Sequence, residues 1–118
     1  MKIKRNDVIF VKCSVTEKNG SVQCYDRPAV VIQNNMGNQH STTLIVAYLT
    51  SQIKRLDMPT HIVLSGYKGL TKSSMVMLEQ IDTISKNDVI EVMDHLRDED
   101  VQKLNYSICA SLALKNVC

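Results

Sequence analysis

Short apolar runs separated by polar turns make up the first two-thirds of the chain. Each run is five to seven residues long and rich in β-branched side chains, which favours strands over helices. We expect strands over residues 7–13, 29–33, 43–49, 60–64 and 74–78, with the last extending toward Ile84. The segments at 17–21 and 34–42 are rich in turn residues, and the second holds at most a short helical turn. Several short strands at this spacing predict a small barrel or sandwich.

The last third of the chain changes to a helical period. Apolar residues recur there every three or four positions and form one stripe of an amphipathic helix: Val101, Leu104, Ile108 and Leu112. Three acidic residues at 98–100 precede this stripe, at the end where the helix dipole is positive. A shorter helix is expected over 86–92, since Ser85 stands where an N-cap belongs.

Composition and length fit one cytoplasmic domain spanning residues 1–118. With 44% hydrophobic and 22% charged residues, the chain has an ordinary composition, and it lacks the roughly 18 consecutive apolar residues that cross a bilayer. The apolar patch near the N-terminus is too short for a signal peptide. The four cysteines form no CxxC pair and no cluster with histidine, so we expect free thiols rather than a zinc or redox site.

Charge is unevenly distributed along the chain. Residues 1–80 carry ten Lys and Arg against five Asp and Glu, a net charge of +5, and residues 81–118 carry four against seven, a net charge of −3, which together give the formal +2. This asymmetry is either a chance property of a solvated surface or the sign that the first part faces a polyanion.

Polar side chains gather at the ends of the predicted strands. In a barrel such ends meet at a rim, where rigid strands can present them to a ligand, although polar strand ends also occur simply because they meet water. The candidates are Arg27, Gln33, Asn34, Thr50, Ser51, Gln52, Thr60, His61, Glu79 and Gln80. The motifs of serine hydrolases, phosphate-binding loops and zinc proteases are absent, and the three histidines are scattered singly. An enzyme built on this sequence would work without metal or cofactor.

Four segments follow one another in a fixed order: RPAVVIQNNMGN, TLIVAYLTSQI, MPTHIVL and MVMLEQIDTISK. From Arg5 to Leu114 this order resembles the MazF/PemK family of bacterial toxins, the endoribonuclease half of toxin–antitoxin pairs. The resemblance implies a mainly β fold with α, an SH3-like small β-barrel of the MazF/PemK/CcdB kind with a C-terminal amphipathic helix. It also implies a homodimer, metal-free cleavage of single-stranded RNA at short preferred sequences, and a MazE-like antitoxin whose acidic tail occupies the RNA groove.

The same resemblance implies that Arg27 and Thr50 are catalytic, because both match catalytic positions of the family. In metal-free cleavage the RNA 2′-hydroxyl attacks the adjacent phosphate, so the substrate supplies the nucleophile. Arg27 offers a permanent planar cation that fits two phosphate oxygens, and Thr50 can donate its hydroxyl to a non-bridging oxygen. We weight the electrostatic role of Arg27 above a general-acid role, and no strong general base is evident.

The remaining candidates have two interpretations. Ser51 and Gln52 follow the Thr50 strand, and the other six match family motifs; all carry groups that could read splayed-out bases. Some could instead bond the loop backbone and shape the groove. His61 could also carry a proton, because unperturbed histidine titrates near neutrality.

One loop departs from the family, which usually has GSEQGG before the arginine. Here Val22 replaces the acid, and Cys24 and Tyr25 replace the two glycines, which puts an acid–base role for that glutamate in doubt. Asp26 could orient the neighbouring guanidinium, and Tyr25 could stack on a base.

Two other functions remain open. A non-enzymatic toxin of the same fold could act on a protein target such as DNA gyrase, but the aromatic C-terminal motif of that branch is missing from a chain without tryptophan. A catalytically degenerate homologue that only binds antitoxin is the other alternative, supported by the altered loop.

Overall fold

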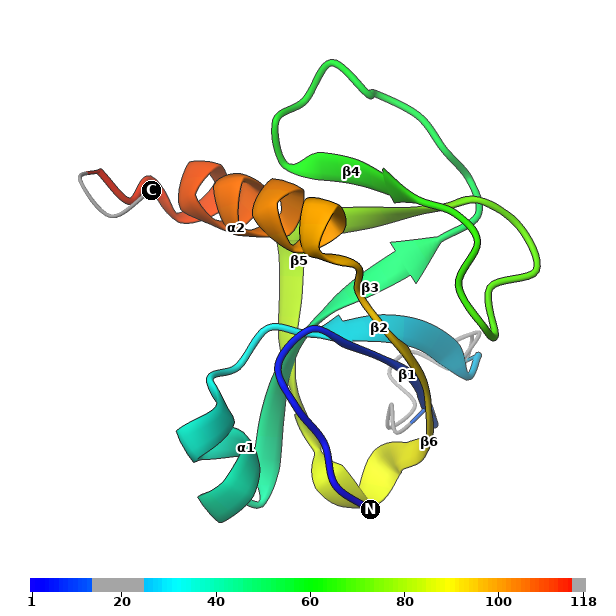
Figure 1. Ribbon diagram of the computed structural model, residues 1–118, viewed down its shortest axis with the longest axis vertical. Coiled ribbons are helices and arrows are strands. Elements are labelled where there is room, and N and C mark those ends of the chain that lie inside the picture. The colour runs from blue at the N-terminus through cyan, green and yellow to red at the C-terminus, as the bar shows by residue number, and fades with distance from the viewer. Residues whose placement is uncertain (14–24, 116–118) are drawn as a thin grey trace, which may run out of the picture.

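The computed structural model describes residues 1–13 and 25–115, shown in Figure 1. Six strands, two α-helices and a short 3₁₀ turn follow one another in that part of the chain. In chain order they are β1 (Asp7–Val11), β2 (Arg27–Val31), α1 (Asn35–His40), β3 (Thr43–Thr50), β4 (His61–Leu64), β5 (Ser74–Ser85), η1 (Lys86–Asp88), β6 (Val89–His95) and α2 (Asp98–Leu112).

The strands form one antiparallel sheet in the order β4-β5-β3-β2-β1-β6. The long strand β5 pairs with β3 along both halves, but the register shifts between Ala47 and Leu49, and the first half of β5 also pairs with β4. Such shifts increase local twist and bend a sheet. The sheet therefore curls into a half-barrel with α2 packed against β4 and β5 (Figure 1), which confirms the expected mainly β architecture with a C-terminal helix.

Alternation along the strands divides the core between the two faces of the sheet. On β2, Val30 belongs to a cluster with Leu104 of α2, whereas its neighbours Ala29 and Val31 belong to a second cluster inside the curled strands. Successive side chains of a strand point to opposite faces, which explains this division. Arg27 stands two residues before Ala29 on β2, so its side chain lies on the same inner face, beyond the apolar cluster.

The prediction of a helix over 86–92 is wrong. Ser85 does cap a turn, its Oγ accepting from the Asn87 N–H at 3.2 Å, but only the 3₁₀ turn η1 follows. Strand β6 then pairs with β1, and Val89 and Val92 both pack in the inner cluster. The burial of two β-branched residues against a neighbouring strand outweighs the local helix signal.

Segment 34–42 holds more structure than the expected turn. It contains the six-residue helix α1, which Asn34 caps by accepting from the Gly37 N–H at 2.7 Å. Asparagine is a strong N-cap, so the segment carried a helix-start signal.

The prediction of free thiols is wrong for the two cysteines that the structure describes. Cys13 and Cys109 are both disulfide-bonded. Pairing depends on how close two cysteines come in the fold, which their spacing along the chain does not reveal. Cys24 and Cys118 lie outside the described residues. Within residues 1–13 and 25–115, no helix is long and apolar enough to cross a membrane.

Candidate active site

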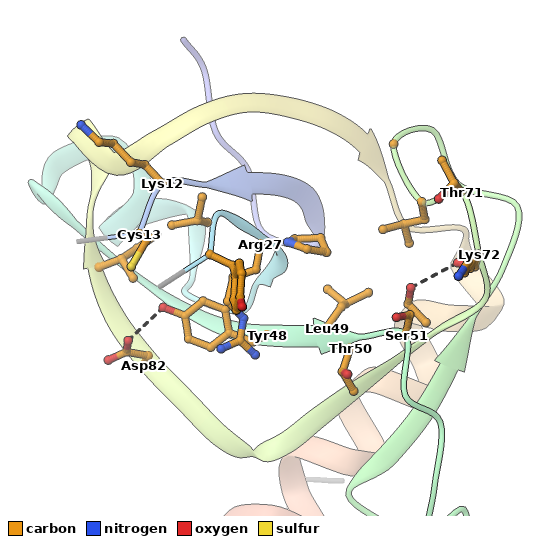
Figure 2. A pocket seen from close by; sticks show the side chains of 17 residues that line it. Lys12, Cys13, Arg27, Tyr48, Leu49, Thr50, Ser51, Thr71, Lys72 and Asp82 are labelled. Carbon is orange, nitrogen blue, oxygen red and sulfur yellow. Dashed lines mark hydrogen bonds between the residues drawn. The ribbon is translucent and has the colours of Figure 1, made fainter. Parts of the chain in front are cut away.

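A cavity of about 770 Å³ opens where β2 begins and β3 ends (Figure 2). Its walls come from the end of β1, the start of β2, the end of β3, the loop between β4 and β5, and the second half of β5. Three of the predicted site residues line it: Arg27, Thr50 and Ser51. The strand ends thus form a hollow rim at this corner of the sheet, as expected for a ligand site on rigid elements.

Sheet register brings Arg27 and Thr50 together. On β2 and β3, Ala29 pairs with Tyr48, and the same register continued by two residues sets Arg27 opposite Thr50 on one face. The pairing of β2 with β3 stops at Ala29, next to Pro28, which has no N–H to extend a ladder. Two residues 23 positions apart in the sequence therefore project into the same hollow.

The guanidinium of Arg27 is stacked on an aromatic ring. Its Cζ lies 4.3 Å from the centroid of the Tyr48 ring, a cation–π distance. Within the described part of the chain, no carboxylate or carbonyl accepts a hydrogen bond from this side chain. Lys12 and Lys72 also line the cavity, so among the described lining residues the cations outnumber the single carboxylate, Asp82. The cavity is therefore suited to an anion with several oxygens.

The carboxylate of Asp82 is already engaged by its neighbours. The Tyr48 hydroxyl donates to Oδ2 at 2.9 Å, and the Thr83 N–H donates to Oδ1 at 2.8 Å. Burial first, and then the bond to Asp82, raise the pKa of Tyr48 to about 12. The phenol consequently stays protonated, as a donor to Asp82, throughout the physiological pH range.

The hydroxyl of Thr50 is oriented by its own turn. Its Oγ1 accepts from the Gln52 N–H at 3.1 Å, which leaves the hydroxyl proton available to donate. Ser51 is exposed on the cavity wall, whereas the Gln52 side chain is exposed and does not line the cavity. Of the three neighbouring candidates Thr50, Ser51 and Gln52, the first two therefore line the cavity.

Gln33 and Asn34 lie at the other end of β2, about 20 Å along the strand from Arg27 at ~3.3 Å per residue. The Gln33 amide donates to Asn38 Oδ1 at 3.1 Å and to the Thr43 carbonyl at 2.9 Å, and Asn34 caps α1. Both side chains thus serve the loop around α1. Their contact with RNA stays a prediction.

The other predicted group gathers on β4 and β5, outside the cavity. Glu79 Oε2 accepts from Thr60 Oγ1 at 3.0 Å and lies 2.6 Å from His61 Nε2, while His61 Nδ1 lies 3.0 Å from the Arg55 carbonyl. The His61 side chain is only 7% exposed, so the cluster fastens the loop after β3 to the sheet. Gln80 is exposed beside it. A role for these four in binding RNA also stays a prediction.

Sequence reasoning missed several polar residues that line the cavity, among them Lys12, Tyr48, Thr71, Lys72 and Asp82. Lys12 lies inside the strand expected over 7–13, and only the structure shows that β1 ends at Val11. Tyr48 stands two residues before Thr50 on the same face. Asp82 carried no such signal, because its place depends on the β3–β5 register.

The altered loop before Arg27 is described only in part. Tyr25 lines the cavity and is exposed, and its stacking on a base stays a prediction. Asp26 Oδ1 accepts from the Cys13 N–H at 2.9 Å, so of the two possibilities for this carboxylate the structure gives no support to an orienting contact with the guanidinium. Val22 and Cys24 lie outside the described residues.

Metal ligands do not cluster in the parts of the chain that the structure describes: no three His, Cys, Asp or Glu side chains come together there. The chemistry at hand is that of Arg27, Thr50 and the lysines. Fold and cavity together define a small β-protein, a half-barrel closed by a helix, with a cavity whose described lining carries more cations than carboxylates.

Comparison with known proteins identifies the family. A model of the PemK-like, MazF-like toxins of type II toxin–antitoxin systems matches residues 4–112. The chain is 41% identical to "Endoribonuclease EndoA" of Bacillus subtilis (strain 168) over 97% of each chain. It is 39% identical to "Endoribonuclease MazF" of Staphylococcus saprophyticus, over 98% of this chain and 95% of that one. The chain belongs to the PemK-like, MazF-like toxin family.

Solved structures share the fold. An endoribonuclease in complex with its cognate antitoxin, from a mycobacterial species, superposes with a TM-score of 0.76 at 20% identity, covering 95% of this chain and 96% of that one. MazF from Deinococcus radiodurans gives a TM-score of 0.75 at 16% identity, covering 97% and 99%. At these identities the likeness concerns the half-barrel and its helix alone.

Proposed function

We propose that the chain is an endoribonuclease toxin that cleaves single-stranded RNA, including mRNA, at short preferred sequences. Two relatives near 40% identity over almost the whole chain are named endoribonucleases, which supports this activity. The observation that carries the proposal is the pair of Arg27 and Thr50 in one cationic cavity, with the Arg27 guanidinium unpaired among the described residues.

In the proposed reaction the RNA provides its own nucleophile. The 2′-hydroxyl oxygen bonds to the adjacent phosphorus while the bond from phosphorus to the 5′-oxygen breaks, giving a 2′,3′-cyclic phosphate and a 5′-hydroxyl. The 2′-hydroxyl loses its proton and the leaving oxygen gains one. Arg27 neutralises the negative charge that grows on the phosphate oxygens, and Thr50 donates its hydroxyl to one of them. No metal or cofactor is needed for these roles.

The partners follow from the same proposal. A similar solved structure contains an endoribonuclease with its cognate antitoxin, and we propose that a MazE-like antitoxin holds this chain inactive in the bacterial cytoplasm, where mRNA is found. Pairing of two copies would join two grooves into one longer RNA path. The similarity to named endoribonucleases favours this function over action on DNA gyrase and over a binding-only homologue.

Substitution of the nucleophile tests the proposal. Purified protein is incubated with RNA in EDTA, and the 5′ ends of the fragments are mapped; an oligonucleotide containing the mapped site is then prepared with a single 2′-deoxy nucleotide before the scissile phosphate. We expect cleavage of the all-RNA strand in EDTA and none of the 2′-deoxy strand. Cutting of the 2′-deoxy strand, or a requirement for added metal, would overturn the mechanism.

A further inference from the structure

Three side chains on neighbouring strands form a row across the cavity face of the sheet. Strands β5, β3 and β2 are adjacent, and they carry Asp82, Tyr48 and Arg27. Asp82 pairs with Val46 in the β3–β5 register, so it shares a face with Tyr48, two residues further along β3. Figure 2 shows the Tyr48 ring between the guanidinium and the carboxylate.

Arg27 and Asp82 carry opposite charges and line the same cavity, so a direct ion pair is one arrangement open to them. Instead, Tyr48 lies between the two charged groups and contacts each of them. Its ring faces Arg27 Cζ at 4.3 Å, and its hydroxyl donates to Asp82 at 2.9 Å. A direct pair would occupy the guanidinium N–H groups that a phosphate needs, because a carboxylate and a phosphate bind the same fork.

We propose that Tyr48 is a positioning residue for Arg27, one that supports the guanidinium from one side and engages Asp82 so that this carboxylate does not pair with it. The role rests on the proposed function, in which Arg27 contacts the scissile phosphate. Tyr48 acts through Arg27 and does not touch the reacting atoms.

A double-mutant cycle separates this role from simple packing. Tyr48→Phe keeps the aromatic ring and deletes the hydroxyl, which frees Asp82 to pair with Arg27; kcat/KM for RNA cleavage should fall about tenfold. Asp82→Asn alone should cost less than about threefold, because the amide oxygen still accepts from the phenol. The double variant should recover to within about threefold of the wild type, since a neutral amide does not attract the guanidinium.

Recovery is the decisive readout. A loss caused by poorer packing in Tyr48→Phe would persist or deepen in the double variant, and that result would overturn the proposal. Full activity of Tyr48→Phe would overturn it as well. Tyr106→Phe, on the exposed face of α2 with 66% of that residue exposed, is the matched control and should cleave like the wild type.

Two further measurements separate the role of Tyr48 from the proposed function. The phenol absorbance of Asp82→Asn, titrated against pH, should show one tyrosine titrating earlier than in the wild type; an unchanged curve would contradict the Tyr48–Asp82 contact without any assay of activity. Wild-type cleavage together with an inactive Arg27→Ala leaves the proposed function standing, so failure of the cycle then counts against Tyr48 alone. Wild-type protein that leaves RNA intact overturns the proposed function and the role of Tyr48 in it.

Discussion

The molecule contains the same trio of residue types twice, in two different settings. The cavity triplet consists of Arg27, Tyr48 and Asp82, and the helix triplet consists of Arg97, Tyr67 and Asp100. In both, the guanidinium carbon lies over the tyrosine ring, at 4.3 Å and 4.2 Å respectively, and the tyrosine hydroxyl donates to the aspartate. The stacking distance and the phenol–carboxylate bond are alike, but the arginines differ: Arg97 also pairs with Asp100 at 3.5 Å, whereas Arg27 has no carboxylate partner among the described residues.

The helix triplet is closed. Arg97 donates to the Ser65 carbonyl at 2.7 Å and lies 3.5 Å from Asp100, and its own N–H donates to the Tyr67 hydroxyl at 2.9 Å. Tyr67 and Asp100 are 4% and 5% exposed. These contacts join the start of α2 to the loop after β4. The N–H groups of Arg97 that make them are bonded to protein acceptors, so the helix triplet stabilises the fold.

The cavity triplet is open. Its arginine makes no hydrogen bond or ion pair with the rest of the described chain, and it faces the cavity that Thr50 also lines. Residue types alone therefore do not separate a structural trio from a functional one. The state of the guanidinium donors does, because a donor already bonded to protein cannot bind a phosphate.

Arg27→Ala should have the largest effect on cleavage and little effect on stability. Removing the cation that faces the phosphate should lower the rate of RNA cleavage about a thousandfold, roughly 4 kcal/mol of transition-state stabilisation. The free energy of unfolding should change by less than about 1 kcal/mol, because only a stacking contact is lost. Fragment assays and urea unfolding measure the two quantities. Arg55→Ala removes an exposed arginine that pairs with Asp57 outside the cavity; it is the control and should cleave normally. Persistent full activity of Arg27→Ala would remove Arg27 from the site.

Tyr67→Phe should have the opposite profile. It leaves the buried Asp100 carboxylate without the hydroxyl that donates to it, and the Arg97 N–H without its acceptor. We expect a loss of about 2 kcal/mol in the free energy of unfolding, measured in urea, with cleavage at 25 °C within about twofold of the wild type. A stability equal to that of the wild type would show that the helix triplet is not the support we infer.

Sequence patterns predicted what depends on local periodicity. The helix at 98–112 and the strands around Val8, Val30 and Val46 follow from spacing, because burial on one face repeats at a fixed interval. Segment 86–92 was misread because its fate depends on pairing with β1, about 80 residues earlier, which no local window contains.

The site residues also separate into those that the local sequence predicts and those that depend on pairing between strands. Arg27 and Thr50 were found because a motif names them, and the structure adds that the β2–β3 register brings them to one cavity. Tyr48 and Asp82 were missed because their roles exist only across three strands. Gln33 and His61 carried the same strand-end signal as Thr50, yet their side chains bond to their own loops, since a polar strand end is as useful for fastening a loop as for meeting a ligand.

Thr50→Val should sharpen the assignment of the cavity. The substitution keeps the branched shape and removes the hydroxyl that can donate to a phosphate oxygen, so cleavage should fall about tenfold, or about 1.4 kcal/mol. Thr50→Ser keeps the hydroxyl and is the matched control, expected to retain most of the activity. Single-turnover rates for the three proteins decide the matter, and equal rates for the valine and serine variants would argue against a role for the hydroxyl.

Alkaline pH should produce the smallest effect, and it concerns the tyrosines of both triplets. The pKa of Tyr48 is raised from 10.0 to about 12, and that of Tyr67 is raised as well, in each case by burial first and then by the bond to an aspartate. A phenol whose pKa is raised in the folded state stabilises the fold fully below the unfolded pKa, and this contribution is lost as pH rises through the folded pKa. Tyr48 should therefore lose its contribution between pH 10 and 12, by about 1 kcal/mol after allowance for the ring's partial exposure.

The measurement is the difference in unfolding free energy between wild type and Tyr48→Phe, in which other alkaline titrations cancel. We expect this difference to decline over that interval and a comparison of wild type with Tyr67→Phe to decline in the same direction. A difference that stays constant to pH 12 would contradict the hydrogen bond from Tyr48 to Asp82.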